Sequence, residues 1–578
     1  MTHSLASSTT TNDAHTNYRN ARDVLFAHAT DIEAARAAFS WPDVGPHFNW
    51  ATDWFDEIAR GNDTPALTVI EPDGSEASRT FDELRRRSNR VAHLLVAQGV
   101  RPGDHVMVML DNRVELWEAM LAILKAGAVI LPTSVVLGPA DVAERVGRAG
   151  VRAVFAAPTD AAKFDGLDVP VRIVIGGEHT GWTPFDGAFA GGDAAGDDDA
   201  PGIHVSSDDA AIVYFTSGTT SRPKMVVHTH RSYPVGHLST TYWIGVRPGD
   251  VHMTISAPGW GKHAWSLFFA PWIAEASIVV LNQPRFDAVA LVEQLDRSGV
   301  TTFCAPPTVW RMLIQADLER KPRALREVLS AGEPLNPEVI ATIERWWGLT
   351  IRDGYGQTEL TAVIGNTPGQ PLEPGAMGHP LPGVDIVLLD PVTGEVADEG
   401  EICLPTRPER PLNLMPGYLG EPDRTASVEH DGYYHTSDVA RRGADGALTF
   451  IGRTDDVFKA SDFKVSPFEV ESILLTHPAV AEAGVVGAPD ETRLNVVKAY
   501  VALAAGSAPD AATARSILAH ARTHMPPYMR VRRVEFFELP KTISGKIRRV
   551  ELRTREVDAA GSRIATEFRE QDFDDLKG

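Results

Sequence analysis

The stretch YFTSGTTSRPK, residues 214–224, contains five Ser and Thr hydroxyls within seven residues and ends in Pro-Lys. The residues before it, AIVYF (211–215), are apolar, β-branched and aromatic, which is typical of a buried strand, and MVVHTH (225–230) after it begins apolar again. Backbone N–H groups and small hydroxyls in a tight loop make an anion site, to which Lys224 adds a positive charge. A flexible Ser/Thr linker is the alternative, but linkers are rarely flanked so closely by apolar segments. The stretch therefore predicts an anion-binding loop between two core elements.

The chain has 578 residues, which predicts two or more domains. Its 55 Lys and Arg against 77 Asp and Glu give a net charge of −22, which argues against nucleic acid bound by a general basic surface. Two distant cysteines, Cys304 and Cys403, indicate neither a disulfide framework nor a cluster of metal ligands. A reducing cytoplasm is the expected location.

The first residues, MTHSLASSTTTNDAHTNY, lack the basic and apolar regions of a signal peptide, and we expect residues 1–30 to form a disordered tail. Apolar runs long enough to cross a bilayer do not occur in the sequence, so no membrane partner is expected.

Strand-like and helical patterns alternate along the first three quarters of the chain. HVMVML (105–110), VELWEAMLAILKAG (114–127) and AVILP (128–132) predict strand, helix and strand, with further strands expected at 151–158 and 171–177. This alternation predicts an α/β fold of layered, mostly parallel sheets. The Gly-, Ala- and Asp-rich segment 187–202 is expected to be a surface loop.

A different organisation begins near residue 450. An amphipathic helix started by Pro is expected in SPFEVESILLTHPAV, followed by strands at 481–489 and 495–503 and a second helix at 514–525. These elements predict a compact α+β domain of about 100 residues.

Further motifs follow the hydroxyl-rich loop in order: AGEP (331–334), RDGYGQTE (352–359), YYHTSDVARR (433–442), GRTDD (452–456) and PKTISGKI (540–547). With the loop, they resemble the adenylate-forming superfamily of acyl-CoA synthetases, adenylation domains and luciferases. SPFEVES, HPAVAEAGVV and LPKTISGKIRR are most similar to the short- and medium-chain acyl-CoA synthetases. The loop is not a Walker loop, because GxxxxGK[ST] is absent from the sequence.

The resemblance implies a large N-terminal domain of several subdomains (31–452), a hinge (453–456) at Asp455, and a small mobile C-terminal domain (457–578) that carries the catalytic Lys546. Thr358 would contact the α-phosphate, Glu359 would bind Mg²⁺, and Asp438 and Arg453 would reach the ribose. The implied ATP-binding residues are Thr216, Ser217, Gly218, Thr219, Thr220, Ser221, Lys224, Gly332, Glu333, Pro334, Asp353, Gly354, Tyr355, Gly356, Gln357, Thr358, Asp438, Arg453 and Lys546. Ser221 stands where the family usually has Gly.

Coenzyme A is the implied acyl acceptor. Its predicted site is Ser461, Asp462, Phe463, Lys464 and Arg493. Asp462 replaces a family Gly in the pantetheine tunnel, and Arg493 is as consistent with a plain surface residue as with a CoA ligand. A separate carrier protein is therefore the alternative acceptor.

The segment APGWGKHAWSLFF (257–269) resembles the family's acyl-binding segment, and the predicted pocket is Trp260, Gly261, His263 and Gly356. Core packing competes with a pocket role for Trp265, and a surface position is favoured over a substrate contact for Lys262. Gly356 replaces a Trp of the acetate-specific enzymes, which predicts space for several methylenes and an acid larger than acetate. The HTH triplet (228–230) is expected to begin a helix, not to bind a metal.

These features predict an ATP-dependent carboxylic acid–CoA ligase that forms an acyl-adenylate and releases AMP and pyrophosphate. The expected partners are ATP, Mg²⁺, a small carboxylic acid and CoA. A non-catalytic scaffold is disfavoured because Thr358, Glu359, Asp438, Arg453 and Lys546 all have the required chemistry.

Overall fold

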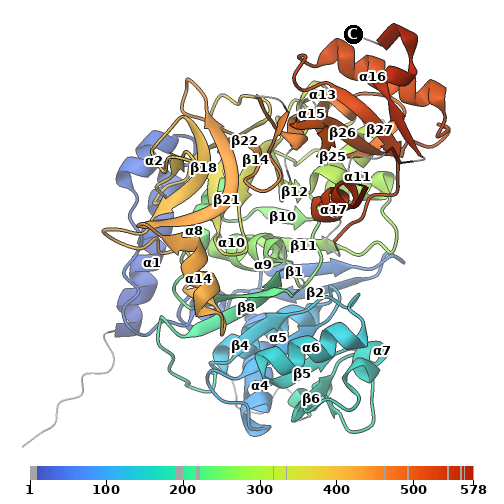
Figure 1. Ribbon diagram of the computed structural model, residues 1–578. Helices are drawn as coiled ribbons and strands as arrows, with labels where there is room; N and C mark the ends of the chain where they lie inside the picture. Colours follow the sequence, from blue (N-terminus) through green and yellow to red (C-terminus); the bar gives the residue numbers. More distant parts are fainter. Residues whose placement is uncertain are drawn as a thin grey trace, which may run out of the picture. The chain divides into compact units, whose positions relative to one another are not determined.

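A computed structural model describes residues 10–190, 199–216, 222–316, 318–333, 335–460, 463–490, 494–542, 546–559, 563–564 and 566–576 (Figure 1). The chain divides into two compact units. The first contains the described parts of 1–218, 222–385 and 405–433, and the second those of 386–404 and 434–578. The proposed hinge at 453–456 stays a prediction.

One sheet of the first unit carries the hydroxyl-rich loop. Its strand order is β19-β9-β8-β4-β3-β5-β6-β7, in which the strands from β8 to β7 are parallel and β9 is antiparallel to both β8 and β19. The bounds are β3 His105–Met109, β4 Val129–Pro132, β5 Val151–Ala156, β6 Val171–Val174, β7 Thr183–Pro184, β8 Ala210–Thr216, β9 Lys224–Thr229 and β19 Gly417–Tyr418. The predicted strand–helix–strand pattern is confirmed, with helix α5 at Val114–Lys125 between β3 and β4.

The prediction that a helix begins at residues 228–230 is wrong, as the structure of residues 225–229 shows. They form most of β9, which pairs with β8 from Thr216↔Lys224 to Ala210↔Thr229, and do not begin a helix. Met225 and Val226 are both buried, and because successive side chains of a strand point to opposite faces, both faces of the sheet are covered here. The loop therefore lies within a β-hairpin.

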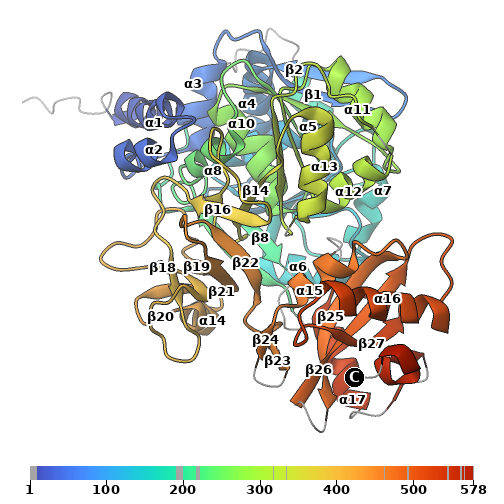
Figure 2. The ribbon, with the colours of Figure 1, turned by 90° about the horizontal axis from the view of Figure 1, so that it is seen from above.

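The second sheet of the first unit carries two further motifs, AGEP at the end of β13 and RDGYGQTE, which begins with β14. From β1 through β11, β10, β12 and β13 to β14 the strands are parallel, and β2, β15 and β16 extend the two sides in antiparallel fashion. The bounds are β1 Pro65–Ile70, β2 Glu76–Thr80, β10 Val251–Thr254, β11 Ser277–Leu281, β12 Thr302–Ala305, β13 Glu327–Ala331, β14 Arg352–Gly356, β15 Ala362–Gly365 and β16 Ala376–Pro380. Helices α11 (Ala288–Arg297), α12 (Pro307–Gln315) and α13 (Pro337–Trp347) pack against it around Phe303 and Trp310 (Figure 2).

The N-terminal segment differs from the expected disordered tail. Helix α1 spans Thr10–Ala27, and the hydroxyl of the fully buried Tyr18 donates to the carbonyl oxygen of Pro234 at 2.8 Å. Arg22, also buried, pairs with Glu275 at 2.6 Å. These long-range contacts order a helix whose composition alone looked like a polar tail. A second helix, α2, follows at Ile32–Ala38.

The described residues of the second unit form three groups of paired strands. The first has the order β17 (Val387–Leu389), β18 (Glu399–Pro405), β21 (Tyr433–Arg442) and β22 (Leu448–Arg453), the second is the pair β23 (Phe458–Ala460) and β24 (Phe463–Val465), and the third has the order β25 (Val480–Asp490), β26 (Leu494–Leu503), β27 (Val531–Phe536) and β28 (Glu567–Arg569). Helices α15 (Pro467–Leu474), α16 (Ala511–His524) and α17 (Arg549–Ala559) accompany the third group. The predicted C-terminal α+β elements, including the Pro-started helix, are confirmed. None of the described helices is long and apolar enough to cross a membrane.

Candidate active site

Lys224 and Glu359 join the end of the hydroxyl-rich loop to the RDGYGQTE motif. Lys224 is the first residue of β9, and its Nζ lies 3.5 Å from Glu359 Oε1 and 3.1 Å from the hydroxyl oxygen of Tyr418 on β19. The Tyr418 hydroxyl donates to the same carboxylate oxygen at 2.9 Å. A cation and a carboxylate are thus held together beside the loop that we expect to bind phosphate. Tyr418 was missed because GYLG has no sequence signal beyond a short strand.

Within that loop, Ser217, Gly218, Thr219, Thr220 and Ser221 lie outside the described residues. Thr216 is described as the last residue of β8 and pairs with Lys224 in register. The predicted contacts of the loop with phosphate therefore stay predictions.

His228 fixes the backbone of Thr358. Its Nε2–H donates to the Thr358 carbonyl oxygen at 2.7 Å, and its Nδ1 lies 3.2 Å from the Ser232 hydroxyl. Complete burial lowers the pKa of His228 to about 4, so the ring is neutral at physiological pH. His228 is thus a positioning residue for Thr358, a role that the HTH triplet did not suggest.

Asp353 and Gly354 are the second and third residues of β14, and they pair with Ser330 and Ala331 at the carboxyl end of β13. Ligands commonly bind at the carboxyl ends of parallel strands, so AGEP and RDGYGQTE share one such edge. Burial raises the pKa of Asp353 to about 7, and one of its carboxylate oxygens accepts the Gly354 N–H at 2.9 Å. Pro334 lies outside the described residues, and Gly332 has φ +104°, which suits glycine.

Trp243 explains why the motif contains Gly354. Its indole N–H donates to the Asp353 carbonyl oxygen at 3.1 Å, and a Cβ added to Gly354 would lie 2.3 Å from the ring. Gly365 on β15 faces the same ring, with a Cβ contact of 2.5 Å. The two glycines therefore provide room for an indole that supports the strand of Asp353.

Gly356 does not leave the open space that the sequence predicted. A Cβ there would lie 2.6 Å from Cη2 of Trp265 and 2.2 Å from the Thr361 carbonyl oxygen. The Trp265 indole occupies this side of Gly356, and its N–H donates to the Tyr233 hydroxyl at 2.7 Å. Trp265, which we expected to be either core or pocket, is the wall at this position.

Gly261 brings the acyl-binding segment to Thr358. A Cβ on Gly261 would lie 3.6 Å from the Tyr233 hydroxyl, and 3.8 Å from both Thr358 Oγ1 and Trp265 Nε1. Gly261, Gly356, Trp265 and Thr358 therefore form one group of neighbours in the first unit. The small size of Gly261 leaves about a methyl group of room between the two hydroxyls and the indole.

His263, Trp260 and Lys262 take other positions than Gly261. The His263 Nε2 lies 3.0 Å from Asn112 Oδ1, and its ring packs against Trp117 with centroids 5.4 Å apart. Trp260 is half-buried. Lys262 is not a surface lysine: it donates from Nζ to the Ala331 carbonyl oxygen at 3.2 Å, which ties this segment to the start of AGEP. The remaining predicted nucleotide residues of the first unit are half-buried: Glu333, Tyr355 and Gln357.

In the second unit, Asp438 and Arg453 are cross-strand partners on β21 and β22. Arg453 Nη1 lies 3.5 Å from Asp438 Oδ1, and its Nε donates to Asp455 at 3.2 Å. Asp438 is 7% exposed. The structure thus brings together the two residues that we expected to reach the ribose, beside the predicted hinge residue.

The side chain of Lys546 is exposed. Its carbonyl oxygen accepts the Thr542 N–H at 2.8 Å, and Lys541 and Ile547 form an antiparallel bridge; residues 543–545 lie outside the described residues. An exposed lysine suits a group that must approach a substrate. Among the predicted CoA residues, Ser461, Asp462 and Arg493 lie outside the described residues, Lys464 is exposed, and Phe463 stacks on Tyr528 with centroids 4.9 Å apart.

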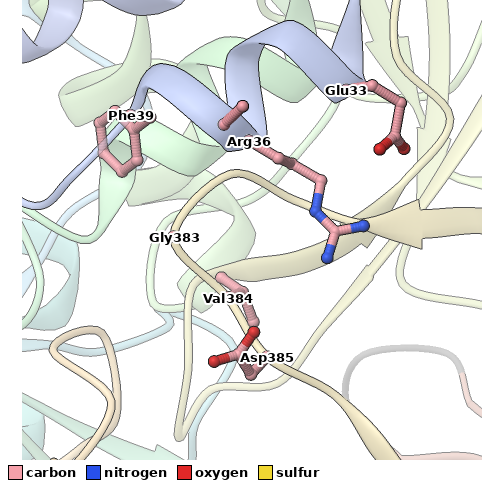
Figure 3. A pocket seen from close by; sticks show the side chains of 7 residues that line it. Glu33, Arg36, Phe39, Gly383, Val384 and Asp385 are labelled. Carbon is pink, nitrogen blue, oxygen red and sulfur yellow. The ribbon is translucent and has the colours of Figure 1, made fainter.

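A separate surface hollow of the first unit lies between α2 and the turn at 383–385 (Figure 3). Its volume is about 460 Å³, and its charged side chains are Glu33, Arg36 and Asp385. Since it contains none of the motif residues and mixes charges of both signs on an exposed surface, we do not assign the active site to it.

Comparison with known proteins identifies the family of the chain. The family described as AMP-binding enzyme matches residues 54–419, and the AMP-binding enzyme C-terminal domain matches residues 469–546. The chain is 42% identical over 521 residues to 4-hydroxybutyrate–CoA ligase 1 of Metallosphaera sedula, covering 88% of this chain and 91% of that protein. It is 34% identical over 559 residues to the mitochondrial acyl-coenzyme A synthetase ACSM3 of Mus musculus, covering 93% and 96%.

A solved structure, the anthranilate CoA ligase AuaEII in complex with anthranoyl-AMP, superposes with a TM-score of 0.78 at 26% identity, covering 90% of this chain and 99% of that one. The predicted fold class, a large layered α/β region followed by a small C-terminal α+β domain, is confirmed. Because the family match spans well over half of the residues and is supported by relatives above 30% identity, the chain belongs to the AMP-binding enzyme family, whose members include acyl-CoA synthetases.

Proposed function

We propose that this chain is an ATP-dependent carboxylic acid–CoA ligase, which forms an acyl-adenylate with release of pyrophosphate and then transfers the acyl group to CoA with release of AMP. The observation that carries the proposal is the convergence of the phosphate-loop lysine, the RDGYGQTE motif and the acyl-binding segment around Lys224, Glu359, Thr358 and Gly261. These groups supply what adenylation needs: a cation, a carboxylate, a hydroxyl and adjoining room for a small acyl chain.

Each of these residues has a distinct part in the first half-reaction. Lys224 would stabilise phosphate charge, and the Thr358 hydroxyl would donate to the α-phosphate where negative charge develops. The His228 bond to the Thr358 backbone holds that hydroxyl in place without adding charge, because the His228 ring is neutral. Lys546 would bridge the carboxylate and the α-phosphate as a point charge.

Glu359 would hold Mg²⁺. A carboxylate is a hard oxygen ligand that suits this cation, and Glu359 already lies beside the loop expected to bind phosphate. When bound there, Mg²⁺ neutralises charge on the phosphates of ATP. Lys224 and Tyr418 both contact Oε1 of Glu359 and so orient its carboxylate.

The substrate is a carboxylic acid larger than acetate. The names of the two curated relatives, a 4-hydroxybutyrate–CoA ligase and an acyl-coenzyme A synthetase, support a short- or medium-chain acid. The Trp265 wall beside Gly356 favours the shorter end of this range, because an indole removes the depth that Gly356 alone would provide.

Transfer to a separate carrier protein remains the second candidate. It rests on Asp462, which stands where the family has a pantetheine-lining Gly. The full-length relatives with CoA in their names favour CoA as the acceptor.

The test is release of AMP and pyrophosphate with Mg-ATP over C2 to C8 straight-chain acids, 4-hydroxybutyrate and benzoate, each with and without CoA. The Lys546→Ala variant should lose adenylation, while Lys541→Ala, five residues earlier in the sequence, should retain it. Equal pyrophosphate release by both variants would refute the role of Lys546. Adenylation without any CoA thioester would instead support the carrier-protein alternative.

A further inference from the structure

Glu401, Cys403 and His435 form a cluster of three potential metal ligands in the second unit. Glu401 and Cys403 are two residues apart on β18, so their side chains lie on the same face, and His435 lies on the neighbouring strand β21. His435 Nδ1 is 3.0 Å from Glu401 Oε2 and 3.5 Å from Cys403 Sγ, and one ligand atom of each residue lies within 4.8 Å of the others.

We propose that the Glu401–Cys403–His435 cluster binds a zinc-type divalent metal ion. Zinc takes thiolate, imidazole and carboxylate ligands at roughly 2.3, 2.0 and 2.1 Å, so tetrahedral geometry places sulfur and nitrogen about 3.5 Å apart. The observed Cys403–His435 distance of 3.5 Å equals this separation, and the nitrogen–oxygen distance of 3.0 Å needs only a small widening. The fourth position is left for water.

The surroundings already orient the ligands. Glu401 Oε1 accepts the Ser437 N–H at 2.7 Å, which leaves Oε2 directed at His435. Hydrogen bonds of this kind fix metal-binding carboxylates in known sites. The side chains of Glu401 and His435 are 13% and 17% exposed, which provides access, whereas Cys403 is fully buried.

A second cluster in the same unit, made of three glutamates, differs because a lysine already supplies its positive charge. Glu535, Glu556 and Glu567 also bring three ligand atoms within 4.8 Å, but Lys498 Nζ lies among them at 2.6–2.9 Å and supplies the positive charge. Glu401, in contrast, pairs with His435, and none of the ion pairs of the described residues joins it to a lysine or an arginine. Of these two clusters, the one that contains Cys403 is therefore where a bound metal ion would supply the positive charge.

Metal binding at this cluster requires the loss of one proton. Metals bind cysteine as the thiolate, so the Cys403 thiol gives up its proton when it becomes a ligand. When the metal–sulfur bond forms, the thiol proton leaves to solvent, and the His435 hydrogen moves from Nδ1 to Nε2 as Nδ1 becomes a ligand. Metal affinity should therefore rise as pH rises. The proposal does not depend on the ligase function.

The test is titration of reduced, metal-stripped, untagged full-length protein with Co²⁺, read by the thiolate-to-cobalt charge-transfer absorption, followed by Zn²⁺ displacement. The wild type should bind one equivalent. Cys403→Ser should abolish the band and weaken Zn²⁺ binding by at least about 100-fold, because a hydroxyl is a poor ligand for these metals. Cys304→Ser, which changes the other buried cysteine, is the matched control and should keep both signals.

A wild-type protein without the band, or a band that survives Cys403→Ser, would overturn the proposal. A zinc-induced rise in melting temperature, present in the wild type and Cys304→Ser but absent in Cys403→Ser, gives a second readout that does not involve activity. If Cys403→Ser fails to fold, His435→Gln provides the same comparison, with loss of tight binding expected and unchanged binding contradicting the site.

Discussion

Lys498 offers the sharpest test of how the second unit is stabilised. Its ammonium group lies 2.9 Å from Glu535, 2.6 Å from Glu556 and 2.7 Å from Glu567, and all four side chains are at most 4% exposed. These residues come from β26, β27, α17 and β28, so one cation ties together four elements of the C-terminal sheet and its helix. Replacing Lys498 with Met keeps the aliphatic length and removes the charge.

The expected cost follows from what the change leaves behind. Three carboxylates would remain buried within 4.8 Å of one another, with Arg555 and Arg569 as the cations that still contact them at 2.6 and 2.5 Å. Removing one partner of a buried ion pair typically costs 3–5 kcal/mol, and we expect about that for Lys498→Met. Because 1.4 kcal/mol is a factor of ten, the opening equilibrium should rise by roughly two to three and a half orders of magnitude.

Hydrogen exchange of the β26 and β27 amides in the full-length protein measures this opening directly, without requiring the two units to unfold together. Lys541→Met is the matched control, since Lys541 forms a 2.7 Å pair with Glu482 in which both side chains are more than 30% exposed. An exposed pair of this kind contributes about 0–1 kcal/mol. Equal exchange in the two variants would refute our account of Lys498.

The loss of stability in Lys498→Met should also depend on pH, in a direction that follows from the pKa of Glu535. In the wild type, burial would raise the pKa of Glu535, but hydrogen bonds from Lys498 and Arg555 hold it below its ordinary value. Without Lys498, burial should raise the pKa of Glu535 above its ordinary value, so the native state binds more protons than the unfolded state. Stability is then lost as pH rises through that raised pKa, and the defect of Lys498→Met should be larger at pH 8 than at pH 5.

Three changes test the first unit. Trp265→Ala should shift the preferred acid toward longer chains, measured as kcat/KM over a C2 to C8 series, since one buried methylene changes discrimination by roughly 1–3 kcal/mol; an unchanged optimum would exclude Trp265 as the wall. Gly354→Ala should destabilise by about 1–3 kcal/mol in thermal unfolding through its 2.3 Å contact with Trp243, whereas Gly147→Ala, with no atom within 4 Å, should not destabilise; similar melting temperatures would contradict the packing. Glu359→Gln should raise the Mg²⁺ concentration needed for half-maximal adenylation at constant ATP, and an unaltered requirement would remove Glu359 as a ligand.

Local sequence patterns predicted the elements whose determinants are local. The strand at 105–110, the helix from Val114 and the Pro-started helix at Pro467 all follow from periodicity and from helix-start signals, and the structure confirms them. The strand β9 was missed because its last two residues, His228 and Thr229, were grouped with His230 as the start of a helix, and this triplet has no strand signal of its own. It becomes a strand through pairing with β8, and its buried His228 is satisfied by Thr358, 130 residues away in sequence.

The motifs similarly identified the site residues, but they did not predict the volume available beside them. RDGYGQTE contains Asp353, Gly356 and Thr358 in the expected order, yet the volume beside Gly356 depends on Trp265, which lies on another element about 90 positions earlier in the chain. Removing an indole from the motif therefore did not create a cavity, because a second indole, held by Tyr233, reaches the same position. The size of the acyl site is a property of three segments packed together. For this reason, the chain-length preference of Trp265→Ala would tell more about the substrate than any further comparison of the motif alone.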